Sequence, residues 1–114
     1  IYDFIRLRLL NGEPMSLDAT VMPLNLVPGL NKTHLESSVF RYVQETLGLK
    51  IMGSYRVVRA LKPNALDREH LVCEQTDPVL EVEQVIYLED GTPLEYAHCH
   101  YRYDHGGIVI VNNG

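Results

Sequence analysis

Two stretches of alternating apolar and polar residues flank the turn sequence Asn11-Gly12-Glu13-Pro14 near the N-terminus. Alternation with a period of two places successive side chains on opposite faces of a strand, and a Gly-containing turn between such stretches favours a tight reversal. Residues 5–9 and 15–21 are therefore predicted to form an antiparallel hairpin. A chain with such a hairpin is restricted to folds that contain an antiparallel sheet.

The register of this hairpin follows from the requirement that the apolar residues of both strands share one face. A three-residue loop meets this requirement and places Leu10 opposite Pro14. The cross-strand pairs on the other face are then Arg8 with Ser16 and Arg6 with Asp18. This face of the hairpin is predicted to carry two guanidinium groups beside a hydroxyl and a carboxylate.

A helix is predicted after a loop that extends to Leu35 and is rich in Gly, Pro and Asn. Apolar residues at helical spacing within 39–47 indicate about three turns, which end at Gly48. Ser37 and Ser38 both suit the N-cap position of this helix. The sequence leaves open which of the two is the cap.

The rest of the chain is rich in residues that favour β-strands. Strands are predicted at 50–61, 79–88, 94–103 and 108–111, and a short helical turn at 65–71. The turn sequence Glu89-Asp90-Gly91-Thr92 predicts a second hairpin between two of these strands. The order of elements predicts an α+β fold, in which helices lie beside an antiparallel sheet.

Length and charge limit the kinds of protein that this chain can be. Its 114 residues suffice for one domain, and 10 Lys and Arg against 15 Asp and Glu give a net charge of -5. This charge excludes a uniformly basic surface for nucleic acid or anionic lipid. No apolar run is long enough for a membrane span, and charges interrupt the apolar N-terminal stretch, unlike in a signal peptide. We therefore expect a cytoplasmic protein without membrane contact. Since Ile1 is not an initiator methionine, we expect one domain of a longer protein.

The polar face of the first hairpin is a candidate anion site. Arg6 and Arg8 can bind carboxylate or phosphate oxygens in a forked geometry. A helix start at Ser37 or Ser38 adds free N–H groups and the positive end of the helix dipole. The alternative is a surface ion pair between Arg6 and Asp18, with a serine that only caps the helix.

The late strand at 94–103 is a second source of candidate ligand contacts. Alternation places Glu95, Cys99 and Tyr101 on one face of this strand. A carboxylate and a phenol on one sheet face can bond to ligand hydroxyl groups. The alternative is that both residues serve only packing and solubility.

The sequence offers little support for metal binding or catalysis. His98, His100 and His105 could supply imidazole ligands, but no metal-binding motif accompanies them, so no metal or other cofactor is expected. Cys99 lacks a base, because its neighbours His98 and His100 point to the opposite strand face, and no catalytic residue is predicted. Cys73 and Cys99 are also too few for a disulfide framework.

An ordered set of short motifs resembles a known protein family. In chain order the motifs are Arg6-Leu7-Arg8, Asn11-Gly12-Glu13-Pro14, Pro28-Gly29-Leu30, Ser38-Val39-Phe40, Pro78-Val79-Leu80, Asp90-Gly91-Thr92-Pro93-Leu94-Glu95 and Tyr101-Arg102-Tyr103-Asp104. The set is similar to the UTRA domain, the effector-binding half of bacterial GntR-type transcriptional regulators of the HutC subfamily. The resemblance assigns residues 1–114 to this domain and implies a chorismate-lyase-like α+β fold. It also implies a winged helix-turn-helix that would precede this domain and that the chain lacks.

The resemblance also implies roles for individual residues. In family members that sense phosphorylated sugars, the phosphate is held by the residues that match Arg6, Arg8 and Ser38. The sugar is faced by the residues that match Asp18, Glu95 and Tyr101. The chain departs from the family pattern at Tyr103, where the family often has Gly, and at His105-Gly106-Gly107.

The function that the resemblance implies is regulatory and not enzymatic. We expect a homodimeric, effector-sensing domain of a transcriptional repressor that binds a small anionic metabolite, with a phosphosugar as the main case. Its contact with DNA would run through the missing domain. One alternative is a chorismate-lyase-like enzyme that acts on a small carboxylate, and another is a dimerisation module without a ligand. Product formation or ligand-dependent thermal stabilisation distinguishes these three roles.

Overall fold

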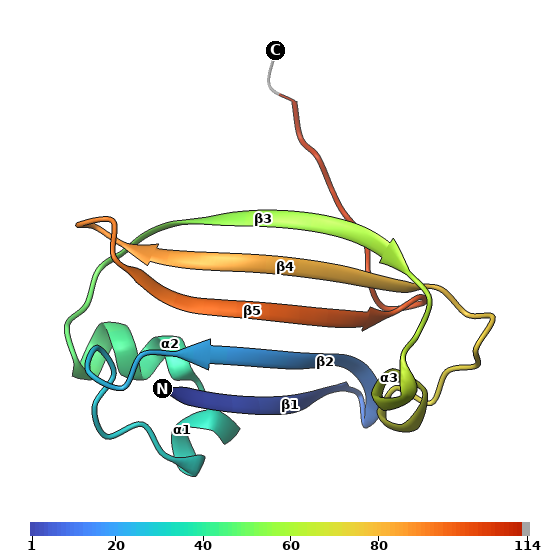
Figure 1. Ribbon diagram of the computed structural model, residues 1–114, viewed down its shortest axis with the longest axis horizontal. Helices are drawn as coiled ribbons and strands as arrows, with labels where there is room; N and C mark the ends of the chain where they lie inside the picture. Colours follow the sequence, from blue (N-terminus) through green and yellow to red (C-terminus); the bar gives the residue numbers. More distant parts are fainter. Residues whose placement is uncertain (113–114) are drawn as a thin grey trace.

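A five-stranded antiparallel sheet forms the body of the molecule in the computed structural model, which describes residues 1–112 (Figure 1). Its strands are β1 (Tyr2–Leu10), β2 (Glu13–Met22), β3 (Ile51–Leu61), β4 (Val79–Leu88) and β5 (Pro93–Arg102). Their order across the sheet is β1-β2-β5-β4-β3, so the last two strands lie between the first hairpin and β3. The predicted α+β class is confirmed.

The first hairpin has the predicted register over most of its length. Arg6 lies opposite Asp18 and Arg8 lies opposite Ser16, as the alternation of apolar residues requires. The four polar residues therefore share one face of the sheet. The alternation of apolar residues is therefore enough to predict this face.

Nearer the turn the predicted register is wrong. Leu10 lies opposite Glu13 and not opposite Pro14. The turn consists of the two residues 11–12, whose φ angles of 53° and 80° match the tight turn that Asn-Gly favours. Met15 is then the extra residue of a β-bulge, which returns the pairing to the predicted register.

Three short helices lie between β2 and β3: α1 (Lys32–Glu36), α2 (Val39–Arg41) and η1 (Tyr42–Thr46), the last of which is a π-helix. The predicted loop up to Leu35 is wrong, because α1 occupies its end. Asn31 and His34 start α1 with a capping box, in which the Asn31 side chain accepts a hydrogen bond from the His34 amide. The usual signature has Glu or Gln in the position of His34, so the pattern does not reveal this helix.

The two serines before α2 have different roles. Ser38 is the N-cap of α2, and its Oγ accepts a hydrogen bond from the Arg41 amide at 3.2 Å. Ser37 ends α1, and its hydroxyl donates to the Thr33 carbonyl at 2.9 Å. The predicted helix is present between Ser38 and Gly48, although η1 winds its second half with a wider turn.

The remaining predictions hold except at the C-terminal end. β3, β4 and β5 are present, and α3 (Ala65–His70) is the predicted helical turn. Residues 108–111 are wrong as a strand prediction, because they have no strand partner and their apolar side chains are exposed. They run past β3 and away from the sheet (Figure 1). Strand propensity alone does not supply the neighbouring backbone that a strand needs.

The two faces of the sheet are distinct, and we name each by its charged residues. The arginine face carries Arg6, Arg8, Asp18 and Glu95, and the histidine face carries His98 and His100. Helices α1, α2 and η1 pack over one end of the arginine face through a cluster of Met22, Val27, Val39, Val43, Ile86, Leu88 and Leu94. Helix α3 covers the other end of the sheet on the histidine face, where the cluster is Leu17, Leu71, Cys73 and Val79.

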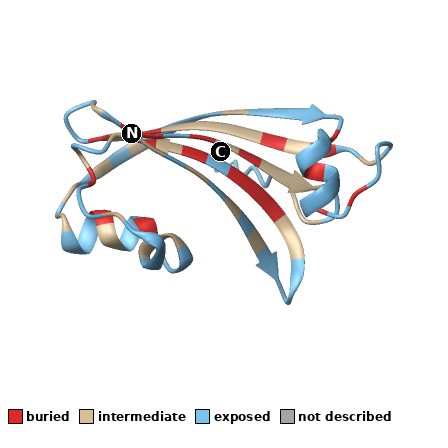
Figure 2. Ribbon diagram, turned by 60° about the horizontal axis from the view of Figure 1, so that its bottom comes forward, coloured by how far each residue is buried: buried red, intermediate tan, exposed pale blue. Residues whose placement is uncertain are grey.

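Buried residues lie mainly on the strands and on the sheet-facing side of the helical segment (Figure 2). Because each cluster covers only one end of one face, the middle of the arginine face has no helix above it. Within residues 1–112, every helix is too short to cross a membrane.

Candidate functional site

A cavity of about 560 Å³ lies on the arginine face. All five strands contribute to its wall, together with α2 and the segment that follows β5. Its lining includes the polar and charged residues Arg6, Arg8, Asp18, Arg56, Gln84, Glu95, Cys99 and Tyr101. The volume is within the range of about 300–1,000 Å³ that is typical of small-molecule sites.

Arg8 forms the most connected polar cluster of the cavity. Its Nε lies 2.8 Å from Asp18 Oδ2 and donates to Ser16 Oγ at 3.0 Å. Its Nη2 donates to the Tyr101 hydroxyl at 2.9 Å. Burial by itself lowers the pKa of the Arg8 guanidinium, but the attraction of Asp18 and the bond to Tyr101 outweigh burial and raise it. Arg8 is therefore a fixed positive charge in the wall.

The ion pair with Asp18 differs from the one considered from the sequence. Arg6 is the cross-strand neighbour of Asp18, but Arg8 makes the contact. The Arg6 side chain turns toward the helical segment, where its Nη1 lies 3.4 Å from the Leu35 carbonyl. Cross-strand opposition predicts which residues are near one another, but a long side chain can bond to a diagonal neighbour.

Two polar atoms of this cluster lack a hydrogen-bond partner within the described part of the chain. They are Arg6 Nε and Asp18 Oδ1, and both are buried. Asp18 as a whole is only 3% exposed. A buried polar group without a partner costs about 1–3 kcal/mol, so its place in a cavity wall needs an explanation. A ligand that supplies an acceptor to Arg6 and a donor to Asp18 would remove this cost.

Glu95 is a second carboxylate of the cavity wall. It is 8% exposed, and burial raises the pKa of its side chain, partly offset by a hydrogen bond from Gln84 and by the charge of Arg6. The Gln84 amide donates to Glu95 Oε1 at 3.4 Å. The cavity therefore combines a positive region on β1 with acceptors on β2 and β5.

Cys99 lies between these groups but has no nucleophilic character. Burial and the neighbouring Asp18 raise the pKa of its thiol to about 12. Its reactive thiolate form is therefore absent near neutral pH.

The sequence predictions and the cavity overlap in part. The predicted site residues that line the cavity are Arg6, Arg8, Asp18, Glu95 and Tyr101. Ser37 and Ser38 are not lining residues, and each hydroxyl is engaged in a helix terminus. Helix α2 contributes Phe40 instead, which follows Ser38 by two residues.

Sequence reasoning missed the part of the wall that is formed by Arg56, Gln84 and residues 105–109. Arg56 and Gln84 lie on β3 and β4, and no local pattern brings these strands to the same face as Arg8. Gly106 was the sequence signal for the last segment. In the structure, a Cβ at this position would lie 2.8 Å from Tyr101 Cβ. The Gly-Gly pair therefore marks a close approach of the chain to the sheet.

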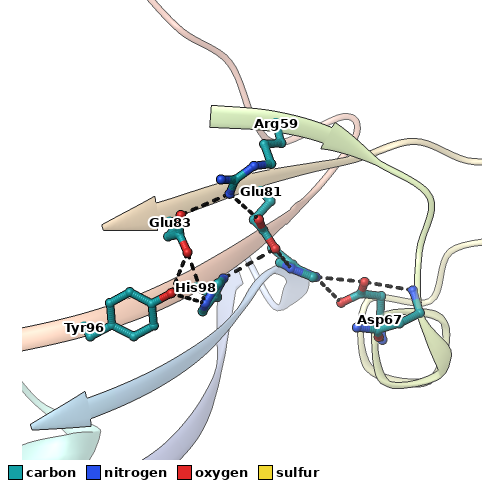
Figure 3. A network of polar contacts seen from close by, with 8 residues as sticks. Arg59, Asp67, Glu81, Glu83, Tyr96 and His98 are labelled. Atoms are coloured by element: carbon teal, nitrogen blue, oxygen red, sulfur yellow. Dashed lines mark hydrogen bonds and ion pairs between the residues drawn. The ribbon is translucent and has the colours of Figure 1, made fainter. Parts of the chain in front are cut away.

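The histidine face carries a separate polar network (Figure 3). His100 bridges two buried carboxylates, with Nδ1 2.9 Å from Asp67 of α3 and Nε2 2.8 Å from Glu81 of β4. Arg59 extends the network, because its Nη1 donates to Glu81 at 3.1 Å. His98 lies beside it, whereas His105 lines the cavity on the other face, so the three histidines do not converge.

Comparison with known proteins places this geometry in a family. The UTRA domain family matches residues 1–105. The HTH-type transcriptional regulator GmuR of Bacillus subtilis is 42% identical over 112 residues, which make up 98% of this chain and 47% of that protein. The chain thus spans about half the length of the curated regulators that it matches.

Solved structures agree with this assignment. A GntR-family transcriptional regulator from Bacillus cereus superposes with a TM-score of 0.86 and is 31% identical, over 98% of this chain and 78% of that one. The effector-binding domain of the B. subtilis trehalose repressor TreR superposes with a TM-score of 0.85 and is 28% identical, over the same shares of 98% and 78%. The chain belongs to the UTRA domain family, whose structural relatives are effector-binding domains of GntR-type transcriptional regulators.

Proposed function

We propose that this chain is the effector-sensing domain of a bacterial transcriptional repressor and that a phosphosugar binds the cavity of the arginine face. The observation that carries this proposal is the polar cluster of Arg8, Asp18 and Tyr101, which lines the cavity beside the buried atoms Arg6 Nε and Asp18 Oδ1 that have no partner within residues 1–112. The names of the relatives support a regulatory role. The trehalose repressor among them supports an effector related to sugars.

The charge distribution of the wall matches the two halves of a phosphosugar. Arg6 and Arg8 supply guanidinium donors on β1, which suit the oxygens of a phosphate. Asp18, Glu95 and Tyr101 supply oxygen acceptors or a hydroxyl for sugar hydroxyl groups. Because Ser37 and Ser38 lie outside the wall, the proposed phosphate contact rests on the two arginines.

The regulatory step in this proposal is a shift between two arrangements of a homodimer. DNA binding would reside in an N-terminal winged helix-turn-helix, in the cytoplasm, and a two-fold protein would match a palindromic operator. The effector controls the equilibrium only through unequal affinity for the two arrangements. A coupling of about 1–3 kcal/mol suffices for appreciable control of DNA binding.

Thermal unfolding of the chain with a set of hexose phosphates and neutral sugars tests this proposal. An effector at a hundredfold excess over its Kd stabilises the folded state by about 2.7 kcal/mol, which is roughly 10 °C in Tm for a domain of this size. Arg8→Ala should abolish this shift. Arg41→Ala is the matched control, because Arg41 is exposed on α2 and its guanidinium pairs with Glu45 at the helix surface.

Two results would contradict the proposal. Equal stabilisation of the parent chain and of Arg8→Ala by neutral molecules would remove the anion assignment. Turnover of a small carboxylate such as chorismate, detected as product, would favour the lyase alternative instead, since fold alone does not decide between these functions.

A further inference from the structure

The arginine-face cavity has a second polar end, which lies near the opposite edge of the sheet from Arg8. Arg56 on the outer strand β3 donates from Nε to Gln84 Oε1 at 3.0 Å. Gln84 in turn donates from Nε2 to Glu95 Oε1 at 3.4 Å. A continuous chain of hydrogen bonds therefore runs from the sheet edge to the middle of the cavity.

The strand order and register give the separation between the two ends of the cavity, at Arg8 and at Arg56. One cross-strand row of the arginine face runs from Arg6 through Asp18, Cys99 and Val82 to Val58. Arg56 lies one row away, two residues along β3 from Val58. Four strand intervals separate β1 from β3 in the sheet order, which corresponds to about 19 Å between these strands.

A single hexose phosphate does not use both ends. With its phosphate on Arg6 and Arg8, its ring lies over β2 and β5, where Asp18 and Glu95 are available. The floor beyond this point includes Val82 and Val58, and Arg56 and Gln84 provide polar groups beside them. The far end therefore has room and polar groups for a second sugar attached to the first.

The hydrogen bond from Arg56 also fixes the orientation of the Gln84 side-chain amide. Because its Oε1 accepts from Arg56, its amide nitrogen is directed toward Glu95. Within residues 1–112, Arg56 uses only Nε for a side-chain bond, so its terminal amino groups remain available as donors to an oxygen-rich ligand. The far end thus offers donors, which suit the hydroxyl and ring oxygens of a second sugar.

We propose that Arg56 is a specificity-determining residue that selects a phosphorylated disaccharide over a hexose phosphate. This inference rests on the proposed function, because it takes the phosphate position at Arg6 and Arg8 as given. Arg56 contributes donors to the second sugar, and it positions Gln84 against Glu95.

Isothermal titration of the chain with single-sugar and two-sugar phosphates tests this inference. The probes are glucose 6-phosphate and mannose 6-phosphate against trehalose 6-phosphate and cellobiose 6-phosphate. We expect at least one disaccharide phosphate to bind about tenfold or more tightly than either hexose phosphate, as a charge-assisted hydrogen bond provides. Arg56→Gln should remove this advantage and weaken the hexose phosphates much less, because they reach Arg56 only through Gln84 and Glu95.

Two further variants separate the contributions. Arg8→Ala should weaken all four ligands alike, and Arg41→Gln should weaken none. Arg56→Lys keeps the positive charge but loses the Nε donor that holds Gln84, so it should restore only part of the advantage. Unfolding without ligand verifies that each variant is folded.

The outcomes distinguish this inference from the function on which it rests. Binding of hexose and disaccharide phosphates with equal affinity, unchanged in Arg56→Gln, overturns the role of Arg56 and leaves the proposed function intact. Absence of binding by every phosphosugar overturns both.

Discussion

Both faces of the sheet carry acidic side chains beside basic ones, but the two faces differ in how completely these groups are hydrogen-bonded. On the histidine face, both nitrogens of His100 are bonded to carboxylates, and Asp67 and Glu81 each have a partner. On the arginine face, Arg6 Nε and Asp18 Oδ1 have no partner within residues 1–112. Because folding satisfies most buried polar groups, a satisfied network indicates a structural role and an unsatisfied one indicates a binding role.

The backbone around each acidic residue explains this contrast. Asp67 is the third residue of α3, and its Oδ2 accepts a hydrogen bond from the Asn64 amide at 3.0 Å. Its other bonds go to His100, so both of its oxygens have a partner. Asp18 lies in the middle of β2, where the sheet occupies the backbone donors and no amide is available to its side chain.

The largest expected effect is on the histidine face. Asp67→Ala removes a carboxylate that is 1% exposed, and it takes away one partner of His100 and the capping box of α3. We expect the free energy of unfolding to fall by about 3 kcal/mol, since breaking a buried pair leaves the other charge uncompensated. Urea denaturation measures this loss, and a loss below about 1 kcal/mol would contradict the structural role of the network.

The corresponding change on the arginine face should act on binding more than on stability. Asp18→Asn keeps the shape of the side chain and removes its charge, including the ion pair with Arg8. We expect a loss of about 1 kcal/mol in unfolding free energy, and a loss of about tenfold or more in affinity for the effector. A stability loss as large as that of Asp67→Ala would remove the distinction between the two faces.

Between pH 6 and 8.5, a pH dependence of stability should arise from His100 on the histidine face. Burial lowers the pKa of His100, but its bonds to Glu81 and Asp67 outweigh burial and raise it above the ordinary 6.5. The stabilisation from protonated His100 is therefore fully present below pH 6.5 and is lost as pH rises through the folded-state pKa. Unfolding between pH 6 and 8.5 should show this decline in the parent chain and a flatter profile in His100→Gln.

The upper limit of that range avoids a second titration. Burial raises the pKa of Cys99 from 9.0 to about 12, so stability also falls once the unfolded chain ionises this thiol near pH 9. Other groups that face His100 are Arg59, which is bonded to Glu81, and His98, which lies 3.5 Å from Glu81. Identical profiles for the parent chain and His100→Gln would show that His100 does not carry the decline.

The smallest effect is expected where the chain closes the cavity after β5. A Cβ at Gly106 would meet Tyr101 Cβ at 2.8 Å, so Gly106→Ala must displace this segment. We expect an affinity loss of a few-fold with a stability loss of about 1 kcal/mol at most. Gly107→Ala is the matched control, because a Cβ there has open space, and equal effects of the two changes would exclude the close approach as the cause.

Local patterns predicted much of the fold and part of the site. The alternation in β1 and β2 identified the face that carries Arg6, Arg8 and Asp18, because the direction of a strand side chain depends only on its position in the strand. The same rule placed Glu95 and Tyr101 on one face of β5. It could not predict α1, whose start uses His34 in an uncommon capping role.

The sequence by itself determined which residues of each strand share a face, where the chain turns, and which family it resembles. The tertiary structure decided which residues of different strands and helices lie close together. Only the insertion of β5 and β4 between β2 and β3 brings Arg56 and Gln84 into the same cavity as Arg8, and only the packing of α3 brings Asp67 to His100. These contacts join residues far apart in the chain, so they depend on the pairing of whole strands and not on the neighbours of any one residue.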